Sequence, residues 1–171
     1  SAAASANPWF ERAARAGDPD AIVTMATACQ KGGDLQGARA WLEAAAQQGD
    51  PAKMYRLGLL CWEMHDMASC RHWLRLSAEG GNPGAMNDLG ELTYTGGDEE
   101  GALEWIERAA AAGNTRSMTT LGDIRMSVGD QEGGRYWYER ASFRGEAPPM
   151  FKLGEMMRDA GGTVVAEQWY A

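Results

Sequence analysis

The stretch GDPAKMYRLGLLCWEMHD, residues 49–66, decides the fold of this chain. Gly49 can adopt the positive φ that closes a preceding helix. Asp50 is a good N-cap, and Pro51 suits the first helical position, where its missing N–H is not needed. Apolar side chains then recur at i, i+3 and i+7 on one helix face: Met54, Leu57 and Cys61. The stretch therefore predicts a helix of about thirteen residues between two turns.

This pattern recurs along the whole chain with a period of 32 residues. Six of the seven tryptophans follow the period: Trp9, Trp41, Trp73, Trp105, Trp137 and Trp169. A glycine column follows it as well: Gly17, Gly49, Gly81, Gly113 and Gly145. Leu-Gly pairs stand at 57–58, 89–90, 121–122 and 153–154, and an aspartate column consists of Asp34, Asp66, Asp98 and Asp130. So many columns in one period indicate internal structural repeats.

Each repeat also contains a second turn and a second helix. The turn is a Gly-Asp pair at 33–34, 97–98 and 129–130, and His65 replaces the glycine in the equivalent turn. The second helix carries a stripe of small or apolar residues, as in Ala102, Trp105, Ile106, Ala109 and Ala110. Two short antiparallel helices cannot bury their apolar faces alone, whereas stacked pairs can. The prediction is an all-α, right-handed solenoid of helix–turn–helix repeats.

The same register predicts how the chain is organised. Residues 1–6 are expected to be a flexible tether, and residues 7–171 a single repeat domain. A lone helix at 7–16 precedes helical hairpins at about 18–48, 50–80, 82–112, 114–144 and 146–171. The last hairpin stops partway, and no separate capping helix is expected.

Two columns call for a packing reason. A glycine inside a helix is unfavourable by up to ~1 kcal/mol relative to alanine, so the glycine of the Leu-Gly pair indicates close approach of the paired helix. We expect it to face a column of small residues: Ala38, Cys70, Ala102, Gly134 and Ala166. The tryptophan column is expected to fill the wedge between successive hairpins, as core rather than as a ligand platform.

These residues resemble the tetratricopeptide-like superfamily and, within it, the Sel-one-like repeat family. The Leu-Gly pair, the Gly-Asp turn seven and eight residues after that glycine, and the small residue four positions beyond the aspartate match the superfamily pattern. The Sel-type signature Trp-x3-Ala-Ala-x2-Gly occurs at residues 9–17, 41–49 and 105–113. One departure is a loop of tetratricopeptide length after the Leu-Gly pair, where Sel-type units usually have about four more residues.

Composition and charge exclude several classes of protein. The chain has 171 residues, a net charge of −8 and a sequence pI near 4.8. Such a charge repels phosphate backbones and anionic lipid, so neither nucleic acid nor membrane insertion is expected. A partner recognised by charge should be basic. The small, polar opening SAAASANP is typical of a tether, left either after a leader is removed or after the chain is trimmed. The compartment is not fixed by these residues, and a periplasmic or secreted protein is favoured over a cytoplasmic one.

Both histidines and two of the three cysteines lie in CWEMHDMASCRH, residues 61–72. Such a cluster suggests a zinc or redox site. The repeat explains it differently, because Cys61 and Cys70 occupy columns that face the paired helix, and His72 occupies a solvated one. Two buried thiols are therefore favoured. A disulfide between Cys61 and Cys70 is the alternative, since they lie about equally far from the turn on opposing helices.

The sequence contains no arrangement of catalytic residues, and no cofactor or small-molecule substrate is expected. The resemblance implies instead that the first helices line a concave groove that binds a partner. The partner-binding residues that it implies are Tyr55, Leu59, Trp62, Asn87, Glu91, Tyr94, Thr119, Asp123, Met126 and Glu155. Trp62 is singled out because it is the one tryptophan outside the 32-residue period. It could instead shield the end of its own hairpin.

The leading hypothesis is a non-catalytic module that binds a protein or peptide with a basic surface. By family analogy, it would be a bacterial adaptor or an immunity protein that neutralises a secreted toxin or effector such as a phospholipase. The alternative is a metal- or redox-responsive protein that uses Cys61 and Cys70.

Overall fold

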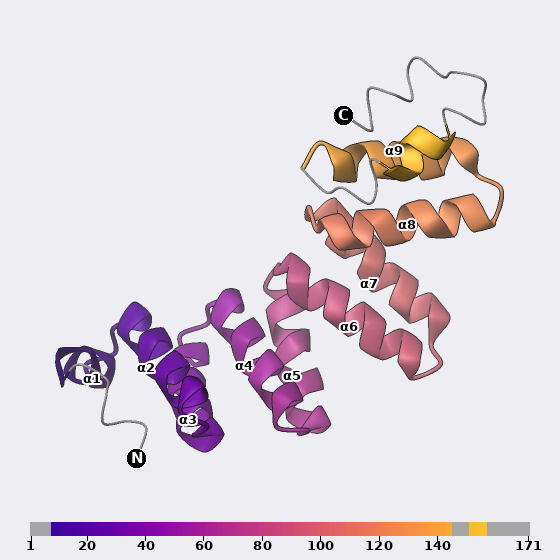
Figure 1. Cartoon of the computed structure of the whole chain (residues 1–171). Coiled ribbons are helices and arrows are strands. Elements are labelled where there is room, and N and C mark those ends of the chain that lie inside the picture. The colour runs from indigo at the N-terminus through magenta and orange to yellow at the C-terminus, as the bar shows by residue number, and fades with distance from the viewer. Residues whose placement is uncertain (1–7, 145–150, 157–171) are drawn as a thin grey trace. The chain divides into compact units, whose positions relative to one another are not determined.

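The computed structural model describes residues 8–144 and 151–156, and these residues form helices joined by short turns (Figure 1). The helices are α1 (Pro8–Arg15), α2 (Pro19–Lys31), α3 (Leu35–Ala46), α4 (Pro51–Glu63), α5 (Met67–Glu79), α6 (Pro83–Thr95), α7 (Glu99–Ala111), α8 (Thr115–Ser127) and α9 (Gln131–Ser142). Residues 151–156 are helical as well. The described part of the chain contains no strand, in agreement with the predicted all-α class. The predicted tether, and most of the last hairpin, lie outside it.

The chain divides into two compact units, Ser1–Leu92 and Thr93–Ala171. In the first unit, consecutive helices from α1 to α5 pack on one another, and the unit also contains α6 up to Leu92. In the second unit, α7 packs on α8 and α8 on α9. The first helices of the pairs, α2, α4, α6 and α8, each have 13 residues, which confirms the length predicted from the sequence.

One residue at each turn ends one helix and begins the next. The N–H of Asp66 donates to the carbonyl of Cys61 at 2.9 Å, closing α4, while its carboxylate accepts the N–H of Ser69 at 3.1 Å, capping α5. The residue before it takes positive φ, which is 60° at His65. Glycines do the same in the other described turns: Gly17, Gly33, Gly49, Gly81, Gly97, Gly113 and Gly129. The predicted roles of both glycine columns and of His65 are confirmed at these positions, and Gly145 lies outside the described residues.

The caps explain a glycine column that the sequence analysis missed. Gly37, Gly101 and Gly133 stand at the third position of α3, α7 and α9, where each donates its N–H to the capping aspartate. A Cβ at these positions would lie 2.8, 3.0 and 2.7 Å from the Cγ of Asp34, Asp98 and Asp130. The cap carboxylate therefore lies close to where a Cβ would stand, although α5 accommodates Ser69 at the same position.

The glycine of the Leu-Gly pair allows close helix contact, as predicted, but the residue that fills the space differs from the expected one. A Cβ on Gly58 would lie 3.0 Å from Cδ2 of Leu74. This leucine lies four residues beyond Cys70, the expected neighbour. In the second unit, Gly134 of the small column does face Gly122, since a Cβ on Gly134 would lie 3.3 Å from the carbonyl oxygen of Gly122.

Two members of the tryptophan column, Trp41 and Trp137, are half-buried and pack against core clusters. Trp41 packs against a buried cluster from α1, α2 and α3: Ala14, Ala21, Ile22, Met25 and Ala45. Trp137 packs against the equivalent cluster of the second unit: Ile106, Ala110, Met118, Leu121 and Ala141. Trp9 is an exception, with 72% of its surface exposed, because no described helix precedes α1. Trp169 lies outside the described residues.

Candidate functional site

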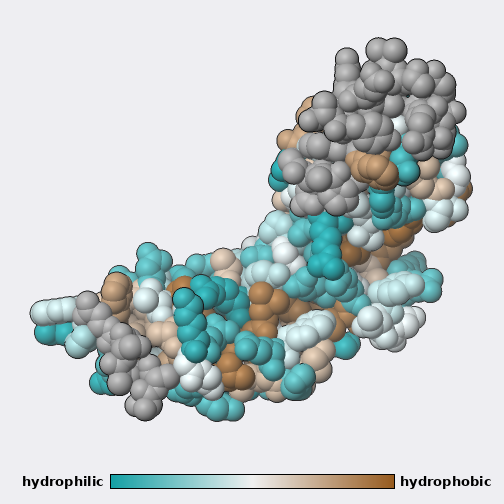
Figure 2. Space-filling view, in the orientation of Figure 1, coloured by the Kyte–Doolittle hydropathy of each residue, from teal (hydrophilic) through white to brown (hydrophobic). Residues whose placement is uncertain are grey.

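One face of α4 presents large apolar side chains to solvent. Tyr55, Leu59 and Trp62 follow one another at i, i+4 and i+7, which places them on one side of the helix. Leu59 is 41% exposed and Trp62 is 45% exposed, whereas Tyr55 is half-buried. Figure 2 shows apolar surface among hydrophilic surface over the part of the chain that contains α4 and α5. We call Leu59 and Trp62, with their acidic neighbours Glu63 and Asp88, the α4 patch.

Neutral side chains of neighbouring repeats hold the two carboxylates of the α4 patch. Gln30 of α2 donates to Glu63 at 3.2 Å, and the phenol of Tyr55 donates to Asp88 of α6 at 2.9 Å. Asn87 also donates to Asp88, at 3.2 Å. An amide or phenol orients a carboxylate without neutralising its charge, whereas an ion pair cancels it. The α4 patch thus combines exposed apolar surface with fixed negative charge.

Asn87 and Glu91, two predicted partner-binding residues of α6, differ in their exposure to solvent. Asn87 is only 2% exposed, so it does not lie on the open surface where the resemblance placed it. Its amide is drawn inward because it donates to Asp88 and, at 3.1 Å, to Glu91. Glu91 is exposed. Asn87 is therefore placed to support the carboxylates rather than to meet a partner itself.

The predicted residues of the second unit are engaged within the chain to different degrees. Tyr94 is 62% exposed, whereas Thr119 bonds the carbonyl of Thr115 in its own helix at 3.1 Å. The carboxylate of Asp123 accepts the phenol of Tyr138 at 2.5 Å and forms an ion pair with Lys152. Burial, followed by the bond to Asp123, raises the pKa of Tyr138. The negative charge of Asp123 is therefore compensated internally, in contrast to Glu63 and Asp88.

Met126 and Glu155, the other two predicted partner-binding residues of the second unit, are half-buried. Met126 lies against α9, because a Cβ on Gly134 would be 2.6 Å from its sulfur. Glu155 belongs to the helical residues 151–156. Neither presents the open apolar surface that Leu59 and Trp62 present on α4.

All three cysteines are buried and free in the structure. Cys61 of α4 and Cys70 of α5 are fully buried. Burial raises the pKa of each thiol, and that of Cys70 reaches about 11. The thiolate is the form that binds metal and exchanges disulfides, so this environment disfavours both reactions. In residues 8–144 and 151–156, no three His, Cys, Asp or Glu side chains are arranged to hold a metal ion.

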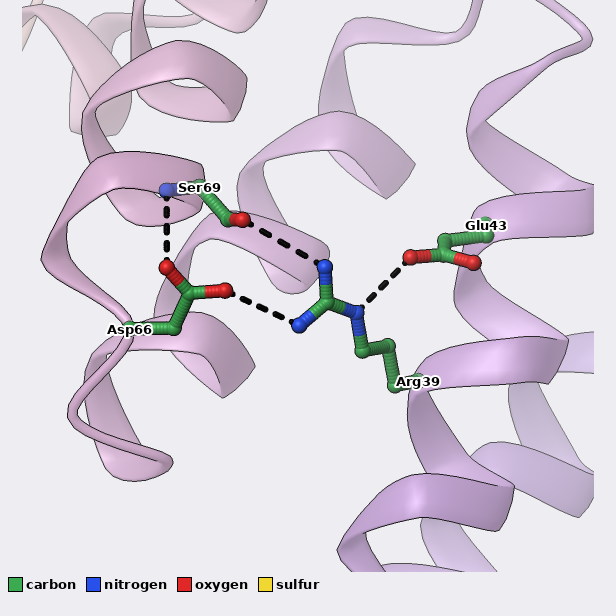
Figure 3. Close-up of polar contacts among 4 residues, drawn as sticks. All are labelled: Arg39, Glu43, Asp66 and Ser69. Atoms are coloured by element: carbon green, nitrogen blue, oxygen red, sulfur yellow. Dashed lines mark hydrogen bonds and ion pairs between the residues drawn. The ribbon is translucent and has the colours of Figure 1, made fainter.

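An arginine-centred cluster joins α3 to the start of α5 (Figure 3). Arg39 donates to Glu43 at 2.8 Å, to Asp66 at 3.0 Å and to Ser69 at 3.3 Å. The hydrogen bonds from Ser69, followed by that from Arg39, lower the pKa of Asp66 from its ordinary 3.8 to about 2. This cluster links two successive hairpins of the first unit and was not predicted from the sequence.

Repeat arithmetic could have found part of the polar network. Gln30 and Glu63 are 33 residues apart, as are Tyr55 and Asp88. First-helix positions separated by one period plus one residue are thus neighbours in the first unit. A search for donor–acceptor pairs at that separation would have selected Asp88, which the predicted set omitted.

None of the helices in the described ranges has the length and apolar character needed to cross a membrane. The family model described as "Sel1 repeat" matches residues 6–18, 28–50, 52–82, 83–114 and 122–142. No curated protein matches this chain.

Several solved structures are similar. A Sel1 repeat protein from Oxalobacter formigenes is 25% identical with a TM-score of 0.77, over 95% of this chain and 75% of that one. The Escherichia coli protein c5321, titled a protective antigen present in uropathogenic strains and displaying an SLR fold, is 24% identical with a TM-score of 0.76. The match covers 95% of this chain but only 39% of c5321. BtubC from P. vanneervenii, at 18% identity and a TM-score of 0.65, shares the fold over 98% of this chain and 86% of its own.

These matches confirm the predicted solenoid of helix–turn–helix repeats and the predicted resemblance. Sel1 repeat proteins generally act as non-catalytic scaffolds for protein interaction. The matched repeats extend over most of the sequence, from residue 6 to residue 142. This chain belongs to the Sel1 repeat family.

Proposed function

We propose that this chain is a non-catalytic adaptor that binds a protein or peptide through the α4 patch. One observation carries the proposal: Leu59 and Trp62 are exposed side by side on α4, next to carboxylates that neutral donors hold in place. Exposed aromatic residues are common anchors of protein interfaces, and a fixed carboxylate favours lysine or arginine on the partner. The partner would therefore present an apolar side chain flanked by basic residues.

The net charge of −8 agrees with a basic partner. A strongly acidic chain attracts a basic protein over distances longer than a single contact, which raises the rate of association at low salt. Because Glu63 and Asp88 are already oriented, less side-chain entropy is lost when they meet a cation. The same charge disfavours nucleic acid and anionic lipid as ligands.

Two finer roles fit such a module. In the first, the chain is an adaptor in bacterial envelope machinery. In the second, it is an immunity protein that blocks a secreted toxin or effector such as a phospholipase. A small acidic protein suits the second role when the enzyme or its substrate entrance is basic.

A photo-crosslinking residue at position 59 tests the proposal in cells that produce this chain. The matched control carries the same residue at the exposed Ala40 of α3, on the second helix of the preceding hairpin. We expect a partner to be captured from position 59 and not from position 40. The captured protein is then purified, and its affinity is measured by calorimetry for the wild type and for Trp62→Ala.

The identity of the captured protein also separates the adaptor role from the immunity role. An enzyme that is captured and loses activity when this chain is added supports an immunity protein. A non-enzymatic envelope component supports an adaptor. Equal capture from both positions, or an affinity unchanged by Trp62→Ala, would contradict the proposed binding surface.

A further inference from the structure

The exposed side of α5 carries a second surface of opposite charge. Arg71, His72 and Arg75 are exposed on this helix, and Met67, one turn before Arg71, is 41% exposed. Met67, Arg71 and Arg75 follow at i, i+4 and i+8 and therefore lie along one side of α5. An apolar residue and two guanidinium groups thus form a stripe on a chain whose net charge is −8.

The 32-residue register shows that this stripe departs from the pattern of two other second helices, α3 and α9. Arg39 and Glu43 form an ion pair within α3 at 2.8 Å, and Arg135 and Glu139 form one within α9 at 2.7 Å. The same two positions of α5 hold Arg71 and Arg75. Like charges one turn apart destabilise a helix, whereas the acid–base pair stabilises it.

No acidic side chain in the described part of the chain pairs with the positive charges of Arg71 and Arg75. Across residues 8–144 and 151–156, neither Arg71 nor Arg75 forms an ion pair. Glu79 lies one turn beyond Arg75 on α5, but the two side chains do not form an ion pair in the structure. Folding alone would be better served by an acidic residue at position 75, as in α3 and α9. The arginine pair is therefore explained by something outside the fold.

We infer that the exposed side of α5 is a docking surface for an acidic segment of a second protein. Each guanidinium offers paired N–H donors that match a carboxylate, and Met67 offers a flexible apolar contact beside them. A protein segment fits better than a nucleic acid or an anionic membrane, because a long polyanion would also meet the repulsion of the acidic remainder of the chain. An adaptor with a basic-partner surface on α4 and an acidic-partner surface on α5 could hold two proteins at one hairpin.

The substitution Arg75→Glu separates docking from folding. It restores the acid–base pair of α3 and α9, so the melting temperature should stay the same or rise. Binding of an acidic segment should nevertheless fall, because one cation is lost and an anion takes its place. A merely structural role for Arg75 predicts the opposite, a loss of stability.

The binding experiment uses the full chain and a fluorescein-labelled peptide in which glutamates recur at i and i+4 around a leucine. Fluorescence anisotropy at low ionic strength is expected to show binding to the wild type that Arg75→Glu weakens by about tenfold or more. The matched control, Glu63→Gln with Trp62→Ala, alters only the α4 patch and should leave this affinity unchanged. A peptide with lysines in place of the glutamates should bind Arg75→Glu as tightly as the wild type. Its affinity should fall instead in the variant with Glu63→Gln and Trp62→Ala.

Three outcomes would overturn the inference. The first is an affinity for the acidic peptide that Arg75→Glu does not change. The second is a melting temperature that falls in Arg75→Glu together with the affinity. The third is tighter binding of duplex DNA or of phosphatidylserine vesicles than of the acidic peptide, with the same dependence on Arg75. None of them bears on the α4 patch, whose test uses position 59.

Discussion

The ring of Tyr138 fills the space that a side chain on Gly122 would need. A Cβ added to Gly122 would lie 2.5 Å from Cδ1 of this tyrosine, whose hydroxyl bonds Asp123. The equivalent contact in the first unit is looser, because a Cβ on Gly58 would lie 3.0 Å from the nearest carbon of Leu74. The same column of the repeat thus has different tolerance for a methyl group in the two units.

Gly122→Ala should therefore destabilise the chain by about 1 kcal/mol. Alanine gains up to ~1 kcal/mol in helix propensity, but the clash with a buried ring costs about 1–3 kcal/mol. Gly58→Ala should lose less stability, since the side chain of Leu74 can change rotamer. Urea unfolding followed by circular dichroism measures both. A second substitution, Tyr138→Leu, should recover part of the loss in Gly122→Ala, and no recovery would place the strain elsewhere.

His65→Gly should raise the stability by up to about 1 kcal/mol. His65 is exposed and has φ of 60°, a region in which a side chain is strained by roughly 1–2 kcal/mol, while the greater freedom of glycine in the unfolded chain offsets part of the gain. Thermal unfolding compares this variant with Gly97→Ala, which introduces the strain at the equivalent turn and should destabilise. A lower melting temperature for His65→Gly would mean that the imidazole contributes a stabilising contact.

Stability should fall as the pH drops from about 4 toward 2, and Asp66 should account for part of the loss. Its pKa is about 2 in the folded chain, below the ordinary 3.8, so the carboxylate stabilises the fold above the unfolded value and ceases to do so as it is protonated. Asp66→Asn keeps a good N-cap but removes the charge. Urea unfolding across this pH range should show a shallower slope for Asp66→Asn, and an unchanged slope would contradict the role of Asp66.

Trp62→Ala and Trp41→Ala should differ sharply in stability. Trp62 is 45% exposed on α4, so its loss should reduce the free energy of unfolding by less than about 1 kcal/mol. Trp41 packs on the core cluster of α1, α2 and α3, and its loss should remove about 3 kcal/mol. Equal losses in chemical denaturation would favour the alternative that Trp62 shields the end of its hairpin.

All three cysteines should react as thiols once the chain is unfolded without reductant. In the folded chain, Cys61 and Cys70 should react slowly near pH 8, because both are buried and burial raises the pKa of Cys70 to about 11. A thiol count with a chromogenic disulfide reagent, in the presence and absence of denaturant, measures both quantities. A single thiol in the denatured chain would show a disulfide and revive the redox alternative.

The local fold could be predicted from the sequence because each turn is specified by residues next to one another. Asp50 and Pro51 begin α4 where the sequence indicated, and His65 takes the positive φ of the glycine that it replaces. These are short-range effects of caps, dihedral angles and helical spacing, so they repeat wherever the residues repeat. The period of 32 residues then determined the order of helices and the family.

Which side chains meet across repeats was decided only by the tertiary structure. The family resemblance implied that Asn87 and Asp123 meet a partner. In the structure Asn87 is buried beneath two carboxylates, and Asp123 is paired with Lys152. Contacts between helices depend on side-chain direction and on how closely the helices approach, and a column of one-letter codes carries neither. For that reason the period predicted the helices, whereas the positions of Glu63, Asp88 and the Arg39 cluster emerged only from their packing.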